Sequence, residues 1–511
     1  MNEGAGQLTS SSGEREGSSG LGFPITTGLL IVLVAVATRI VAWWNPVAHV
    51  DDQFYLLAGE ELLKGHWPYV DVWDRKPLGL FLLYAGIAWI GGGSILGLNL
   101  VATAFAATTA IVIRHIALRF ASPVGATLAA LAYLVAMPVF GGQTGQSPVF
   151  YNLLMAGAAW LLFRAADSRD AASIRWHALA AMLLCGLSIT IKQVSFVEGV
   201  YFGLAFLWLV KRAGANWVST VATGALMVVV ALLPYALTMA GYALAGDAAL
   251  REFIYANFVS IFERLGWSPE AKMAGAAYFL LFLLPLLGMG GWGAISRWRS
   301  RRHDAAQLLL LGWLAASLLG YLAVPAFFDH YTLPLLVPLA LSTTTLFDRD
   351  GRWLYFGGFV AFYLLQGSIT DWSTNRHEAR LFSEVRRSVE QSRRGGCIYV
   401  ADGPSRLYST AGNCGLTRYL FPDHLHLITE APAVGADTAD ELAMIMVQRP
   451  AVVVTQDRPR LNRFSAASRD ILQRNLARHY RLVMHLPGDG RTAMGGVRVW
   501  QRNDLAQSPA R

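Results

Sequence analysis

The chain has 511 residues, of which 54% are hydrophobic and only 15% are charged. A soluble protein carries about 25% charged residues, so this composition excludes an ordinary soluble enzyme and predicts a polytopic membrane protein. The net charge of +8 does not indicate nucleic-acid binding, because much of the excess lies in short loops between apolar runs, where positive charge keeps a loop in the cytoplasm.

Residues 1–22 are rich in Gly and Ser and predict a disordered cytoplasmic tail. They do not resemble a cleavable signal peptide, because the apolar run that follows is long and has no small-residue cleavage site behind it. Residues 23–370 are expected to form a transmembrane catalytic domain. Its eleven predicted spans are 23–44, 97–113, 122–140, 148–165, 177–191, 196–211, 218–239, 273–295, 306–325, 332–347 and 353–370.

Five connectors between these spans are strongly basic, and the positive-inside rule assigns all five to the cytoplasm. The connectors at 141–147, 192–195, 240–272 and 326–331 are poor in Lys and Arg or long, and are assigned to the outside. With a cytoplasmic N-terminus, eleven spans place the C-terminus in the periplasm, outside a bacterial inner membrane. The basic residues are Arg114, Arg119, Arg164, Arg169, Arg175, Lys211, Arg212, Arg297, Arg299, Arg301, Arg302, Arg349 and Arg352.

The apolar run at 78–92 does not fit this alternation, because a span there would invert the loops on one side of it. As a helix it would be only about 22 Å long, which is short for a hydrocarbon core of about 30 Å. We therefore expect a helix at the outer membrane surface. Residues 45–96 then form one long first periplasmic loop, and loops of that size inside a compact fold tend to be functional.

This first loop holds the densest chemistry of the sequence. Adjacent carboxylates, Asp51 and Asp52, follow the first span, and Arg75 and Lys76 lie near the start of the expected surface helix. A carboxylate at a membrane boundary can accept a proton from a hydroxyl, and a nearby Lys or Arg can hold a phosphate. The alternative is a solvated loop whose charges only keep it in water, and composition alone does not separate the two.

The segment from 51 to 77 resembles the signature of the polyprenol-phosphate-dependent glycosyltransferases of the GT-C superfold. The resembling branch holds the protein O-mannosyltransferases (glycosyltransferase family 39) and the aminoarabinose transferases of lipid A. Its first periplasmic loop opens with an Asp-Glu pair, followed by an aromatic residue, a short helix, a Pro-Tyr turn and a Lys-Pro helix start. The matching residues here are Asp51, Asp52, Tyr55, Ala58, Leu62, Gly65, Pro68, Tyr69, Lys76 and Pro77.

The resemblance implies an all-α GT-C membrane domain with surface helices in the first loop and a soluble periplasmic C-terminal domain. It implies that Asp51 is the catalytic base. The second position departs from the family pattern, with Asp52 in place of Glu, so the roles of the two carboxylates are left open. Tyr55, Arg75 and Lys76 are expected to bind substrate.

Further candidates for substrate binding lie in the other outer connectors. Gln146 and Asn152 can hydrogen-bond a sugar, although a plain polar turn is as good an interpretation of them. Lys192 ends the fifth span and either neutralises the donor phosphate or extends to the headgroups. Glu198 either pairs with Lys192 or faces water. Arg39 is expected to extend to the outer surface, although its side of the span also puts it close to the loop that carries Asp51.

The two remaining outer segments carry a basic and aromatic group and an amphipathic stretch. His330 and Tyr331 would lie near the lipid phosphate, against an interfacial His and an aromatic-belt Tyr as the alternative. Arg264 lies in the amphipathic stretch within 240–272, which is expected to lie on the membrane surface, and would contact the phosphate.

Residues 371–511 mix charges with strand-like and helical runs and predict a small periplasmic α/β domain. Strands are expected within 397–402, 451–456 and 497–502. Cys397 and Cys414 both lie in this region, and an oxidising periplasm permits a disulfide between them; two free thiols are the equal alternative.

The resemblance therefore implies transfer of a sugar from a polyprenyl-phosphate-linked donor to a hydroxyl of a glycan, lipid or protein acceptor, with inversion. Membrane lipids are the other expected partners. No metal requirement follows from the sequence, and the acidic loop offers ligands to a divalent ion if one is used. The rival hypotheses are a transporter or flippase of lipid-linked sugars and an O-antigen polymerase or ligase.

Overall fold

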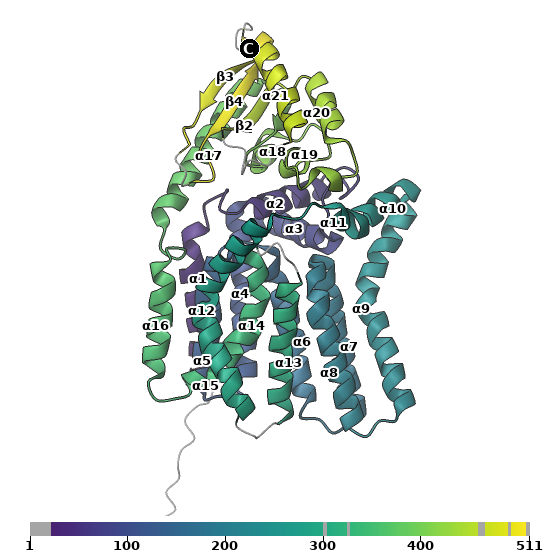
Figure 1. The fold of residues 1–511 in the computed structure, drawn as a ribbon, viewed down its shortest axis with the longest axis vertical. Coiled ribbons are helices and arrows are strands. Elements are labelled where there is room, and N and C mark those ends of the chain that lie inside the picture. The colour runs from purple at the N-terminus through teal and green to yellow at the C-terminus, as the bar shows by residue number, and fades with distance from the viewer. Residues whose placement is uncertain (1–21, 300–303, 324–327, 458–464, 489–491, 507–511) are drawn as a thin grey trace, which may run out of the picture.

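The structure is a computed structural model, and it describes residues 22–299, 304–323, 328–457, 465–488 and 492–506. All but the last residue of the predicted tail lie outside the described residues. Figure 1 shows a bundle of long helices below, a layer of short helices across its upper end, and a small sheet with helices at the top.

Each of the eleven predicted spans coincides with a helix or a pair of consecutive helices. Eight of the described helical segments are long and apolar enough to cross a membrane, and the chain is a multi-pass membrane protein. The bundle helices are α1 (Gly22–Arg39), α4 (Ile95–Ala117), α5 (Pro123–Ala136), α6 (Ser147–Ala165), α7 (Ala171–Ile191), α8 (Phe196–Arg212), α9 (Trp217–Ala245), α12 (Pro269–Arg299), α13 (Ala305–Leu322), α14 (Leu333–Ser342), α15 (Thr344–Phe347) and α16 (Arg352–Leu365). Short 3₁₀ turns extend several of them, at η1 (Ile40–Ala42), η2 (Met137–Phe140), η3 (Gln193–Ser195) and η5 (Asp329–Thr332).

Connectors that the sequence assigns to the cytoplasm meet at one end of the bundle. The Arg119 side chain donates to Asp167 at 2.7 Å, which joins the α4–α5 connector to the α6–α7 connector. The Ser122 backbone N–H donates to Asp348 at 3.1 Å, which joins the first of these to the α15–α16 connector. This common end agrees with the alternation of loops that the positive charges predicted.

Helices α2 (Val50–Leu63) and α3 (Leu78–Gly91) lie across the opposite end of the bundle (Figure 1). The run at 78–92 therefore forms a helix that does not follow the direction of the spans, as predicted. The two helices pack closely at Gly59, where a Cβ atom would lie 2.6 Å from the backbone nitrogen of Ala85. Only a residue without a side chain permits this approach.

The amphipathic stretch between α9 and α12 also lies at this upper end (Figure 1). It forms α10 (Asp247–Ile254), a π-helical turn η4 (Tyr255–Val259) and α11 (Ser260–Glu263). The backbone N–H of Leu265 donates to the carbonyl of Thr429 at 3.1 Å, so the stretch is attached to the C-terminal region.

The C-terminal region contains a four-stranded sheet in the order β1-β2-β4-β3, in which β1 and β2 are parallel and the other pairs antiparallel. The strands are β1 (Ile398–Val400), β2 (Val452–Gln456), β3 (Tyr480–His485) and β4 (Val497–Arg502). The helices are α17 (Trp372–Arg393), α18 (Arg406–Ala411), α19 (Asp423–His426), α20 (Thr438–Val447) and α21 (Ala466–His479), with 3₁₀ turns η6 (Ala431–Ala433) and η7 (Asn503–Ala506). The three predicted strands are present, and β3 is a fourth that the sequence pattern did not reveal.

Trp73 of the first outer loop is fully buried within the core of the C-terminal region, where it contacts Tyr419 and His424. Its backbone N–H donates to the carbonyl of Arg418 at 2.8 Å. The outer loop and the C-terminal region therefore share a core. The loop is held by the C-terminal region on one side and by the helix bundle on the other.

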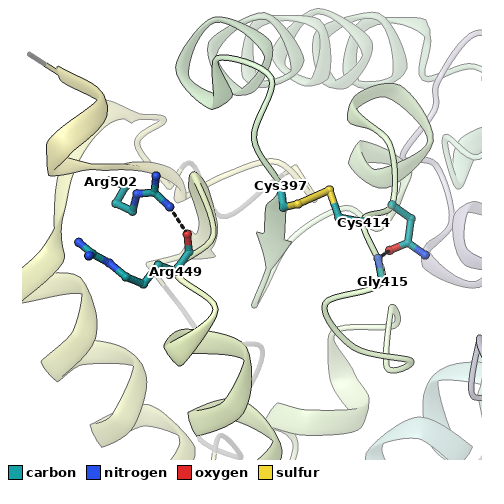
Figure 2. The surroundings of a disulfide bond; sticks show 6 residues. Cys397, Cys414, Gly415, Arg449 and Arg502 are labelled. Carbon is teal, nitrogen blue, oxygen red and sulfur yellow. Dashed lines mark hydrogen bonds between the residues drawn. A yellow bond between two sulfur atoms is a disulfide. The ribbon is translucent and has the colours of Figure 1, made fainter. Parts of the chain in front are cut away.

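The disulfide that the sequence left open is present between Cys397 and Cys414, whose Cα atoms are 5.7 Å apart (Figure 2). It ties the start of β1 to the loop after α18. Cys185 is buried in α7.

Candidate active site

Asp51 and Asp52 lie in the first turn of α2, where the helix dipole favours negative charge. His49 is the N-cap residue, and its ring accepts the backbone N–H of Asp51 at 3.4 Å. The side-chain amide of Gln146, at the start of α6, donates to Oδ2 of Asp51 at 3.1 Å. Gln146, which the sequence offered as a sugar contact or as part of a plain polar turn, therefore bonds one of the two acids directly.

The two adjacent carboxylates face different surroundings. Burial opposes ionisation of Asp51, but His49 and Lys76 outweigh it and hold the pKa of this carboxyl well below its usual range. Burial raises the pKa of Asp52 to about 6, and neither of its oxygens makes a well-formed hydrogen bond within the described residues. Asp51 is half-buried and Asp52 only 3% exposed, so Asp51 is the more accessible of the two.

Two lysines approach the acidic pair from different connectors. The Lys76 ammonium lies 5.7 Å from the ring centre of Tyr55, and the Lys192 ammonium lies 4.2 Å from that of Tyr331. Burial, with the positive charge of Lys76, lowers the pKa of Lys192 to about 7. A bound anion would reverse this shift, because it favours the charged form of the amine.

The backbone that carries Lys76 is held by a strained residue. Tyr69 has a φ of 70°, a conformation that costs a bulky residue about 1–3 kcal/mol, and its side chain is fully buried. Its hydroxyl donates to the carbonyl of Lys76 at 2.8 Å. The Pro-Tyr turn therefore fixes where the Lys-Pro segment enters α3.

His330 lies beside the two lysines and Asp51, but its ring does not carry the positive charge that was expected near the phosphate. Burial and the charge of Lys192 lower the pKa of His330 to about 4, so its ring is neutral at pH 7. Its Nδ1 lies 3.2 Å from Oδ1 of Asp329, and its ring centre lies 6.0 Å from that of His49. A neutral imidazole can still donate a hydrogen bond.

Sequence reasoning missed His49 and Asp329 as members of this group. Each is a direct neighbour of a selected segment, His49 two positions before Asp51 and Asp329 one before His330. A search for His and Asp flanking the chosen motifs would have found both.

Arg75 and Arg264, both predicted to bind substrate, are paired with one carboxylate of the C-terminal region, Glu430. Arg75 also donates to the hydroxyl of Ser260 at 3.1 Å. Glu430 is 4% exposed. These contacts join the first outer loop, the α9–α12 stretch and the C-terminal region, and sequence reasoning did not anticipate Glu430.

Asn152 is buried inside the bundle, where its side-chain nitrogen donates to Leu333 O at 3.0 Å and to the Tyr133 hydroxyl at 3.2 Å. These contacts are to the protein, and they join α6 to α5 and α14. The predicted sugar contact of Asn152 has no support from its position.

Two other interpretations of charged residues are wrong. Arg39 does not extend to the outer surface: it is 1% exposed and donates to Thr144 O at 2.7 Å, which holds the connector before α6. This contact, two residues before Gln146, agrees with the other expectation, that Arg39 lies close to the loop that carries Asp51. Glu198 neither pairs with Lys192 nor faces water. It accepts from Trp313 and Ser317 of α13, both at 2.6 Å, because a carboxylate buried between helices needs internal donors.

No family model and no curated protein matches the sequence. Solved structures do resemble it over most of its length. The crystal structure of ArnT from Cupriavidus metallidurans bound to undecaprenyl phosphate covers 96% of this chain and 100% of its own, with a TM-score of 0.64 at 13% identity. The apo state of the same protein has a TM-score of 0.61 at 14% identity, and covers 96% of this chain and 99% of its own.

The apo oligosaccharyltransferase of Archaeoglobus fulgidus covers 84% of this chain and 69% of its own, with a TM-score of 0.50 at 12% identity. At such identities the likeness is one of fold. The chain has the GT-C fold, as the resemblance in its first outer loop implied.

Proposed function

We propose that the protein transfers a sugar from a polyprenyl-phosphate-linked donor to a hydroxyl of a lipid, glycan or protein acceptor, on the periplasmic face of a bacterial inner membrane. The observation that carries the proposal is the meeting of an ionised carboxylate, Asp51, with two lysines, Lys76 and Lys192, at the outer end of the bundle. ArnT, which shares the fold, is described as bound to undecaprenyl phosphate.

In the proposed reaction Asp51 accepts the proton of the acceptor hydroxyl. The hydroxyl oxygen bonds to the anomeric carbon from the face opposite the donor phosphate, and the bond from that carbon to the phosphate oxygen breaks with inversion. The leaving group is a phosphate anion, so fixed cations at Lys76 and Lys192 lower the cost of its departure. Gln146 orients the carboxylate, and Tyr55 and Tyr331 pack against the two ammonium groups.

Two features support an outward-facing site. The basic connectors meet at the end of the bundle away from α2 and α3, and positive loops stay in the cytoplasm. The disulfide lies in the C-terminal region, and disulfides persist in oxidising compartments such as the periplasm. In this proposal residues 23–370 are the catalytic membrane domain and residues 371–511 the periplasmic domain.

The test uses the purified full-length protein in lipid vesicles with a polyprenyl-phosphate sugar labelled in the sugar. We expect release of free polyprenyl phosphate together with a labelled acceptor, and both should be lost in Asp51→Asn. Glu60→Gln is the matched control, because Glu60 is a carboxylate of the same helix that pairs with Arg406 at 2.7 Å.

The rival hypotheses give different results in the same vesicles. A flippase would move the labelled lipid across the bilayer without cleaving it, and a polymerase or ligase would require a diphosphate-linked glycan as donor. Movement without cleavage, or full activity of Asp51→Asn, would show that the proposed reaction is wrong.

A further inference from the structure

Three potential metal ligands from two outer connectors converge beside Asp51. His49, Asp329 and His330 each offer one ligand atom, and these three atoms lie within 4.8 Å of one another. Asp329 and His330 belong to η5, far from His49 in the sequence, so the convergence is a product of the fold. Two imidazoles with one carboxylate is a donor set that suits divalent transition metals.

The backbone around the three side chains leaves room for their approach. Gly141 has a φ of 70°, and a Cβ atom there would lie 3.1 Å from Oδ2 of Asp329 and 3.5 Å from Nε2 of His49. A residue with a side chain would be strained at this φ, and its Cβ would press against Asp329 while it made an ordinary contact with His49. The glycine therefore allows a carboxylate and an imidazole to lie against the same short turn.

The distances fit an ion after a modest closure of the side chains. Ligand bonds of about 2.1 Å in a tetrahedral arrangement separate the donor atoms by about 3.4 Å. The three ligand atoms lie within 4.8 Å of one another, so closure of the set needs shifts of about 1 Å, and the side chains of His49 and Asp329 are only half-buried. Three protein ligands leave a fourth position open, as in catalytic rather than structural zinc sites.

The charges nearby also accept a cation. The carboxylates of Asp51 and Asp329 lie in the same group as the ammonium groups of Lys76 and Lys192, so the place offers negative as well as positive side chains. The Gln146 amide nitrogen lies 2.6 Å from Nδ1 of His49 and 3.1 Å from Oδ2 of Asp51, so the three-ligand group is one side chain away from the carboxylate.

We propose that His49, Asp329 and His330 bind one divalent transition-metal ion, of the zinc class, at the outer end of the bundle beside Asp51. A bound ion joins the N-cap of α2 to η5 and adds positive charge next to the two lysines. Its ligands differ from the acids of the first loop, which the sequence offered only as ligands for an ion if one is used. Metal binding is measured without substrate, so it does not depend on the proposed transferase reaction.

The experiment uses the full-length protein in detergent, with any affinity tag removed because a histidine tag binds the same metals. After treatment with a chelator, the protein is equilibrated with Zn²⁺, and bound metal is measured by elemental analysis. We expect about one ion per chain, and we expect Co²⁺ in its place to give the visible absorption of a nitrogen- and oxygen-ligated site. Melting temperature should rise with added metal, because the ion binds the folded state.

His49→Gln and Asp329→Asn should each weaken metal binding by about 100-fold or more. Removal of a group that only hydrogen-bonds to a ligand already weakens binding by about 10- to 100-fold, and loss of the ligand itself should cost at least as much. His485→Gln is the matched control, because His485 contacts Asp457 in the C-terminal region and lies outside the group. It should retain the wild-type stoichiometry and affinity.

Size-exclusion profiles and melting temperatures without metal separate loss of the site from loss of the fold. Wild-type protein that binds no Zn²⁺ above background, or ligand variants that bind as tightly as wild type while the control does too, would overturn the proposal. The sugar-transfer assay is run separately. A protein that binds the ion but transfers no sugar contradicts only the proposed function, and a protein that transfers sugar but binds no ion contradicts only the metal site.

Discussion

Helix α2 carries two pairs of neighbouring carboxylates. Asp51 and Asp52 lie in its first turn, and Glu60 and Glu61 lie near its end. At the far end the acids are satisfied by protein partners. Glu60 accepts from Arg406 at 2.7 Å, and Glu61, which is fully buried, pairs with Lys64 at 2.7 Å. Glu61 also accepts from His66 at 2.7 Å and Asn413 at 3.1 Å.

At the first turn the acids have fewer partners. Asp51 has one side-chain hydrogen bond among the described residues, from Gln146, and the oxygens of Asp52 have no well-formed bond there. Lys76 acts on Asp51 through its charge, while the ammonium groups of Lys76 and Lys192 lie over the rings of Tyr55 and Tyr331. The difference teaches that the glutamates of α2 serve the fold, because several protein donors hold them, and that the aspartates of the same helix have fewer such partners, as the proposed reaction requires of Asp51.

The largest expected effect comes from removing the proposed base. Asp51→Asn should lower the turnover number by about 10²- to 10⁴-fold, the usual contribution of a positioned general base, in the vesicle assay. Glu60→Gln should leave the rate per folded protein close to that of wild type. Equal losses in the two variants would remove the distinction between the two ends of α2.

The second effect concerns the C-terminal region, which supplies hydrogen-bond partners to Glu60 and Glu61. Asn413, a partner of Glu61, lies next to Cys414, whose disulfide to Cys397 closes a separation of 17 residues. Replacing both cysteines with Ser should destabilise the protein by about 3 kcal/mol, mainly because the unfolded chain gains freedom. Thermal unfolding with and without a reducing agent measures the loss. Cys185→Ala should keep the response to the reducing agent, and its disappearance in that variant would assign the effect to another thiol.

The third effect has a sign that depends on pH. Because the pKa of Asp52 is raised to about 6 in the folded state, folding favours its protonated form. Its stabilising contribution is present below its ordinary pKa and is lost as the pH rises through about 6. Asp52→Asn should therefore raise the melting temperature at pH 7.5, by the equivalent of about 2–3 kcal/mol, and have little effect near pH 4.

Asp51→Asn provides the opposite case. The pKa of Asp51 is lowered, so its contribution is present above the ordinary value and is lost as the pH falls. This variant should be less stable than wild type at pH 7.5. If both variants shift stability in the same direction at that pH, the two carboxylates do not have the different surroundings described above.

The smallest effect is expected at Glu61. Glu61→Gln removes a buried charge that accepts from Lys64, His66 and Asn413, while it keeps the shape of the side chain. Since hydrogen bonds to a charged group contribute about 1.5–3 kcal/mol and Gln preserves some of them, we expect destabilisation by about 1.5 kcal/mol. Melting temperature measures it, and sugar transfer per folded protein should not change. A loss of transfer without a loss of stability would place Glu61 in the reaction.

Much of the architecture could be predicted from the sequence, because its causes are local. The length of an apolar run determines whether a helix can cross the bilayer, and the charge of a connector determines its side. These two properties alone excluded residues 78–92 as a span, and α3 lies across the end of the bundle. They also placed Asp51, Lys76 and Lys192 at the same end before any contact was known.

The contacts of the site were decided only by the tertiary structure. Whether Asp51 or Asp52 is accessible, that Asp329 lies beside His49, and that Glu430 pairs with Arg75 all depend on how segments far apart in the chain pack together. Periodicity and charge carry no information on such pairs, since many partners would satisfy the same local pattern. The sequence by itself determined which groups gather at one end of the bundle, and packing determined which contacts each of them makes.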